Sequence, residues 1–86
     1  MKDYLAELNE DMLFADGFDD ALVGYVERIT LPTVACYDTN KCIEILMKDM
    51  TSEEAEEYFY YNVAGSYVGE NTPCFLTIIN ENGKGK

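Results

Sequence analysis

The chain has 86 residues, with 17 Asp and Glu, 6 Lys and Arg and no histidine, so its formal net charge is −11 at pH 7. This acidity argues against direct binding of nucleic acid or of an anionic membrane, and without histidine the Ser-His and Cys-His nucleophile pairs are excluded. The length suits one domain with a small core, and no apolar run is long enough to cross a bilayer.

Three cysteines, Cys36, Cys42 and Cys74, leave an odd number without the spacing of a CxxC or His/Cys metal set. The pattern that would indicate secretion, a basic segment followed by an apolar run, is not seen. We therefore expect reduced thiols, a cytoplasmic protein and no metal or cofactor.

The first predicted element is an amphipathic helix over residues 3–13, with Asp3 as its N-cap. The residues predicted on its apolar face are Tyr4, Leu5, Leu8 and Met12. Carboxylates occupy the opposite face, as is typical of a side that faces solvent. This helix could stand apart from the main domain.

The segment FADGFDD, residues 14–20, predicts a turn around Gly17 with three nearby carboxylates, Asp16, Asp19 and Asp20. Calcium in an EF-hand loop needs oxygen ligands at alternate positions and a later Glu, which this spacing does not provide. A solvated acidic turn is therefore preferred over a metal site.

Three strands are predicted, over residues 21–29, 33–37 and 74–79. The first two should form a hairpin with a loop of about three to five residues, and Gly24 predicts a β-bulge or a close backbone neighbour. The third strand is apolar enough to be central or covered on both faces. The polar tail over residues 80–86 is expected to fray.

A helix is predicted after the second strand, from a cap at Asp38 or Thr39 to about Asp49. Its apolar face includes Cys42, which we therefore interpret as a small buried hydrophobe and not as a nucleophile.

The next helix, over residues 51–65, has the clearest sequence signals. Thr51 and Glu54 have the spacing of a capping box, and Gly65 predicts a left-handed C-terminal stop. The first turns carry four carboxylates near the positive end of the helix dipole. They are Glu53, Glu54, Glu56 and Glu57.

Two residues of this helix do not fit a simple amphipathic pattern. Tyr60 falls among the glutamates, either as a lone exposed aromatic or as a contact anchor on an acidic face. Asn62 falls on the apolar face, where it either ties down a neighbouring loop through hydrogen bonds or faces a ligand.

The loop that follows this helix is rich in turn residues. Asn62 and Thr72 could pin it to the helix, while Tyr67 fills the edge of the core. Alternatively, these three residues with Glu70 and Asn71 could form a small polar recess for a peptide or a small ligand.

Three segments, DGFDDALVG, YDTNKCIEILM and MTSEEAEEYFYYNVAGSYVGENTPCF, cover most of residues 16–76. Together they resemble a family of short proteins that tailed bacteriophages encode and that seldom have an assigned function. The resemblance implies a phage origin and a shared fold, and it brings no catalytic residues with it.

The chain is therefore predicted to form one α+β domain over residues 1–86, with a small three-stranded antiparallel sheet packed against two or three helices. We expect a non-enzymatic phage protein that binds and modulates a host or defence protein by occupying a basic surface that normally holds nucleic acid. The predicted contact residues are carboxylates on one side of the domain and one aromatic anchor. They are Glu53, Glu54, Glu56, Glu57, Asp16, Asp19, Asp20 and Tyr60.

Three alternatives stay open. The acidity could serve solubility alone. The chain could be a structural protein that self-associates through Tyr60, Tyr61 and an edge strand. It could also bind a small ligand with the loop over residues 67–72.

Overall fold

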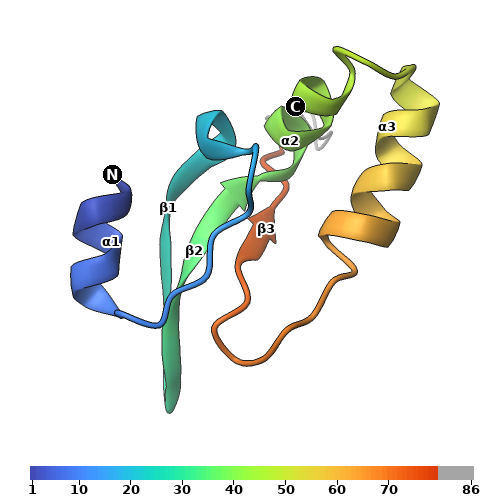
Figure 1. The fold of residues 1–86 in the computed structure, drawn as a ribbon. Helices are drawn as coiled ribbons and strands as arrows, with labels where there is room; N and C mark the ends of the chain where they lie inside the picture. The colour runs from blue at the N-terminus through green and yellow to red at the C-terminus, as the bar shows by residue number, and fades with distance from the viewer. Residues whose placement is uncertain (80–86) are drawn as a thin grey trace.

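Three strands form a mixed sheet in the order β1-β2-β3 (Figure 1). The structure, a computed structural model, describes residues 1–79, so the predicted fraying of residues 80–86 lies outside the described part. Strand β1 (Leu22–Arg28) pairs antiparallel with β2 (Leu31–Asp38), and β2 pairs parallel with β3 (Cys74–Leu76).

The predicted α+β fold, a three-stranded sheet packed against helices, is confirmed. The predicted antiparallel direction of the third strand is wrong, and the strand is neither central nor covered on both faces, since it lies at the sheet edge with Leu76 exposed. Helices α2 (Thr39–Leu46) and α3 (Ser52–Tyr58) connect β2 to β3, and a connection of this length allows a crossover that returns the chain to the same end of the sheet. Strand β3 therefore runs parallel to β2 at the sheet edge, and β2 is the central strand.

The hairpin between β1 and β2 is tighter than predicted. Arg28 already pairs with Leu31, so the turn consists of Ile29 and Thr30 alone, with a φ of 69° at Thr30. The pairing register shifts at Gly24, which confirms the predicted bulge. A Cβ at Gly24 would meet nothing within 4 Å, so a close backbone neighbour is not the reason for the glycine.

Helix α1 (Lys2–Leu8) is shorter than the predicted range of residues 3–13. Met1, and not Asp3, occupies the N-cap position, without a side-chain cap. Tyr4 and Leu8, which were predicted on the apolar face, are exposed. The helix therefore contributes a narrower apolar face than the sequence pattern indicates.

Asn9 ends helix α1 and redirects the chain. Its Nδ2 donates hydrogen bonds to the carbonyl oxygen of Thr33 and to Oδ1 of Asn71, both at 2.9 Å. The Oδ1 of Asn9 accepts from the backbone N–H of Asp11 at 3.0 Å, and asparagine side chains that bond to nearby backbone groups compete with helix formation. Leu5 and Met12, on either side of this break, are both buried.

The N-terminal caps of α2 and α3 are confirmed. Oδ1 of Asp38 accepts hydrogen bonds from the backbone N–H groups of Asn40 and Lys41. Oγ1 of Thr51 accepts from the N–H of Glu54 at 3.2 Å, and Oε1 of Glu54 accepts from the N–H of Thr51 at 3.0 Å. Each helix therefore begins where its capping residues predict.

Helix α3 does not continue as an α-helix to its predicted end. After Tyr58 it becomes a π-helical turn, η2 (Phe59–Val63). The N–H of Ala64 donates to the carbonyl oxygen of Phe59 at 2.8 Å, which is the i to i+5 spacing of a π-helix. Such turns change which side chains share a face.

The predicted left-handed stop at Gly65 is wrong. Among the glycines of residues 1–79, positive φ angles occur at Gly17 and Gly69. A Cβ on Gly65 would lie 2.7 Å from the carbonyl oxygen of Tyr60 and 3.1 Å from that of Tyr61. Glycine is required there because the end of η2 approaches its backbone closely.

The helices and the sheet share one hydrophobic core. Side chains from α1, the central strand, α2 and η2 meet in one buried cluster that includes Leu5, Tyr37, Cys42 and Phe59. Cys42 is fully buried, as predicted. The helices α2 and α3 lie beside the β2–β3 part of the sheet, and α1 lies beside β1 (Figure 1).

Candidate functional site

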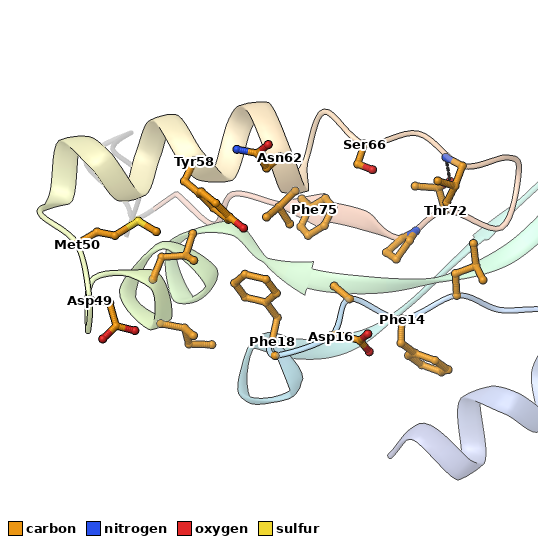
Figure 2. A pocket seen from close by; sticks show the side chains of 18 residues that line it. Phe14, Asp16, Phe18, Asp49, Met50, Tyr58, Asn62, Ser66, Thr72 and Phe75 are labelled. Carbon is orange, nitrogen blue, oxygen red and sulfur yellow. Dashed lines mark hydrogen bonds between the residues drawn. The ribbon is translucent and has the colours of Figure 1, made fainter.

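A cavity of about 660 Å³ lies between helix α3 and the loop that precedes the 3₁₀ turn η1 (Asp19–Ala21) (Figure 2). We call it the groove. Its walls are the loop over residues 13–18 on one side and α3 with η2 on the other, and its apolar floor includes Leu46, Val63 and Phe75. Its volume is typical of a site for a small molecule or for a partner's side chains.

The floor of the groove is held by aromatic packing. The ring of Phe75 lies edge-on to Phe59, with centroids 5.2 Å apart, and 5.7 Å from the ring of Tyr37. Phe59 and Tyr37 are fully buried, whereas Phe75 is half-buried. Phe75 therefore lines the groove and also packs against two buried aromatic rings of the core.

The loop wall is tied to the sheet and to a second loop. The backbone N–H of Ala15 donates to the hydroxyl of Tyr37 at 2.8 Å, and the N–H of Leu13 donates to the carbonyl oxygen of Asn71 at 3.4 Å. Gly17 has a φ of 87°, which confirms the predicted turn. The wall is therefore shaped by bonds to distant residues.

The helix wall presents Tyr58 and Asn62 to the groove. Tyr58 is 43% exposed, and its ring points into the groove (Figure 2). Asn62 lines the groove together with Tyr58 and Val63, the face on which it was predicted, although its side chain is exposed.

The residues of the predicted polar recess do not gather at one point. Asn62 and Thr72 line the groove, whereas Tyr67, Glu70 and Asn71 lie outside its lining. Tyr67 is 78% exposed, so the prediction that it fills the edge of the core is wrong.

The loop after η2 is held by three other sets of hydrogen bonds. Oγ1 of Thr72 accepts from the N–H of Val68 at 2.9 Å and donates to the carbonyl oxygen of Gly69 at 2.6 Å. The carbonyl oxygen of Glu70 accepts from Nη2 of Arg28 at 2.7 Å. Asn71 bonds to the N-terminal segment, as described above. Asn62 takes no part in these bonds, so they do not support its predicted pinning role.

The glutamates of α3 are exposed, and two of them border the groove. Glu54 and Glu57 line a second cavity of about 410 Å³, which shares Asp49, Tyr58 and Asn62 with the groove. Glu53 and Glu56 are exposed outside both linings. The α2–α3 corner and the start of α3 thus give this end of the groove a negative charge.

The three aspartates of the acidic turn point to different places. Asp16 lines the groove, but Asp19 forms a salt bridge with Lys2 at 2.8 Å. The hydrogen bond that the Lys2 ammonium donates to the Asp19 carboxylate raises the pKa of Lys2. Asp20 is exposed in η1, outside the groove. Of these predicted contact residues, the structure therefore places only Asp16 beside the α3 wall.

The acidic residues are not confined to one side of the domain, contrary to expectation. Exposed carboxylates also occur on α1, β1 and α2. They include Asp3, Glu7, Glu27 and Glu44. Tyr60 is 56% exposed and packs edge-on against Phe59, at 5.1 Å between ring centroids, outside the groove.

The buried thiols are poor nucleophiles. Burial, with a smaller contribution from the Asp38 carboxylate, raises the pKa of Cys42 to about 12. Burial also raises the pKa of Cys36. A thiol needs its ionised form to attack a substrate or to bind a metal. Among residues 1–79, moreover, no group of three or more metal-ligating side chains comes together.

Three residues that line the groove were not predicted as site residues: Phe18 and Phe75, which make it apolar, and Asp49 at its acidic corner. Phe18 lies in a segment whose sequence predicts a polar turn, yet its side chain is buried. No local pattern brings these three positions together, because they come from separate parts of the chain.

None of the helices that the structure describes is long and apolar enough to cross a membrane. No family model, curated protein or solved structure matched the chain in the comparisons.

Proposed function

We propose that this chain is a non-enzymatic binding protein that docks on a basic surface of another protein. In the phage setting that the sequence resemblance implies, the partner is a host or defence protein in the cytoplasm of an infected cell. A surface that normally holds nucleic acid suits this role, because such a surface is basic and attracts an acidic chain. The chain itself is too acidic to bind nucleic acid directly.

The observation that carries the proposal is the negative charge of α3, which no salt bridge within residues 1–79 compensates. Its glutamates are exposed, its last turn has no basic residue, and the one salt bridge within residues 1–79 joins Lys2 to Asp19. Glu53 and Glu57 are four residues apart, a spacing at which like charges repel on a helix. A cationic partner surface would relieve this repulsion and would be attracted over long range.

Tyr60 supplies an apolar anchor next to these carboxylates. Its ring is more than half exposed, and its edge-on contact with buried Phe59 limits its motion. Aromatic side chains that are held in place lose little freedom when they bind, which is one reason why tyrosine is frequent at interface hot spots.

The test is a comparison of three baits in a pull-down from host lysate, with the captured proteins identified by mass spectrometry. The baits are the wild type, E53K/E57K and the control E7K/E27K, which makes the same change in net charge on α1 and β1. We expect a basic protein to be captured by the wild type and by the control, lost with E53K/E57K and released by salt. A partner that binds all three baits equally, or that salt does not release, would contradict the proposal.

A second candidate is self-association, favoured by large apolar side chains on the β1–β2 hairpin. Ile29 is 91% exposed at the turn, and Val23 and Tyr25 are exposed on β1, whose outer edge has no partner strand within the described residues. Unpaired strand edges can pair with another chain. Sedimentation should then show a mass that rises with concentration and becomes monomeric with Ile29→Lys.

A further inference from the structure

The groove differs from the rest of the acidic surface because its floor is apolar and firmly supported. Phe18 is buried in the core cluster, and Leu46, Val63 and Phe75 pack against that cluster. These side chains still line a cavity of about 660 Å³. Since the core contacts fix their positions, the floor is a preformed apolar surface.

The charges around this floor are negative. Asp16 lies on the loop wall and Asp49 at the α2–α3 corner, at separate points along the groove (Figure 2). Glu54 and Glu57 line the adjoining cavity. Among the described residues that line the two cavities there is no lysine or arginine. An occupant must therefore combine apolar side chains with positive charge.

We infer that the groove binds a basic amphipathic helix of the partner protein; this inference rests on the proposed function and names the segment that it recognises. A helix carries an apolar stripe with other side chains on both flanks, so lysines beside the stripe can reach acids at several points of the rim. An extended peptide alternates between two faces, and its cations would point away from the groove.

A metabolite is a poorer fit for this groove. Small-molecule sites use a few converging polar groups to fix the ligand. Here the hydroxyl of Thr72 already bonds to Val68 and Gly69. The wall is instead provided by Tyr58, whose ring is 43% exposed and points inward, in the manner of an interface residue.

The test uses a synthetic peptide of leucine and lysine in an amphipathic helical pattern, about four turns long, with one tryptophan on its apolar face. The protein has no tryptophan, so the fluorescence of the probe reports binding directly. A peptide of the same pattern with glutamate in place of lysine is the charge control. Circular dichroism establishes that each protein variant is folded.

Two matched pairs of variants separate the groove from the general charge. D16K/D49K alters the rim, whereas E7K/E27K makes the same change in net charge outside the groove. Tyr58→Ser removes the wall aromatic, whereas Tyr67→Ser removes an exposed tyrosine that does not line the groove. We expect the Kd for the lysine peptide to rise about tenfold with D16K/D49K and with Tyr58→Ser, and to stay within about twofold with the two controls.

Equal weakening by D16K/D49K and E7K/E27K would overturn the groove inference but would leave the proposed basic partner in place. The same holds if the lysine peptide fails to bind while the bait comparison still yields a basic protein that depends on Glu53 and Glu57. Equal binding of the glutamate peptide would also overturn the inference. Failure of both the peptide and the bait comparison would overturn the inference and the proposed function together.

Discussion

The hydroxyl of Tyr37 accepts a hydrogen bond from the backbone N–H of Ala15 at 2.8 Å and thereby ties the loop wall of the groove to the central strand. Tyr37 is fully buried, so no water can replace the bond easily. The position of the loop wall thus depends on one side chain of the sheet.

Tyr37→Phe should lower the free energy of unfolding by about 1–3 kcal/mol, because it leaves the N–H of Ala15 without its partner. Urea denaturation measures this loss. Tyr37→Phe should also increase the rate of amide hydrogen exchange more over residues 13–18 than in the β1–β2 hairpin. Tyr67→Phe, at an exposed site, is the control and should change neither quantity. Unchanged exchange over the loop would show that other contacts hold the wall.

Thr51→Ala should lower the free energy of unfolding by about 1 kcal/mol, because it removes the hydroxyl that accepts from the N–H of Glu54. Thr51→Ser keeps the hydroxyl and should retain most of the stability. Thermal unfolding followed by circular dichroism gives both values. Equal losses in the two variants would mean that packing of the threonine methyl, and not the cap, supports the helix.

Gly65→Ala and Gly24→Ala should have opposite effects on stability. A Cβ at Gly65 would lie 2.7 Å from the carbonyl oxygen of Tyr60. The backbone shift needed to avoid such a clash lowers the free energy of unfolding by about 1–3 kcal/mol. At Gly24 the Cβ enters open space, and its φ is not positive. Gly24→Ala should therefore be neutral or stabilising by about 0.4–1 kcal/mol through the unfolded chain. The midpoints of urea unfolding decide this, and a stable Gly65→Ala protein would contradict the close approach.

Alkaline pH should destabilise the fold through Cys42. Burial raises its pKa from the ordinary 9.0 to about 12 in the folded protein. Below pH 9 the thiol is protonated in both states, so its contribution is constant. Between pH 9 and about 12 only the unfolded thiol ionises, so the free energy of unfolding falls as the pH rises, by roughly 4 kcal/mol in total.

The measurement is urea unfolding as a function of pH for the wild type and for Cys42→Ala. Burial also raises the pKa of Cys36 and of Tyr37, so both proteins should lose stability at high pH. The loss should be smaller in Cys42→Ala. Parallel curves for the two proteins would show that Cys42 does not titrate differently in the folded and unfolded states.

Features that depend on neighbouring residues could be predicted from the sequence. The caps at Asp38 and Thr51 and the bulge at Gly24 are confirmed, because each follows from a few consecutive residues. The end of α1 at Asn9 was missed, since it depends on bonds to distant Thr33 and Asn71. The parallel direction of β3 was missed for the same reason.

The site was only partly predictable. Asp16, Asn62 and Thr72 were named from the sequence and line the groove, whereas Tyr67, Glu70 and Asn71 do not. Asn62 lines the groove with Tyr58, which lies four residues earlier, the spacing that places two residues on one face of a helix. Phe18 was missed because its segment reads as a solvated turn. The groove depends on tertiary contacts between these segments, and no single stretch of sequence encodes it.

The parallel pairing of β2 with β3 implies an order of assembly. The β1–β2 hairpin closes through two residues, whereas β3 can pair only after the chain has passed through α2 and α3, and closing so long a connection costs more entropy. Phe75 arrives with β3, so a chain that holds only the hairpin has no groove floor. A partner helix in the groove would consequently select the finished molecule and stabilise it by mass action.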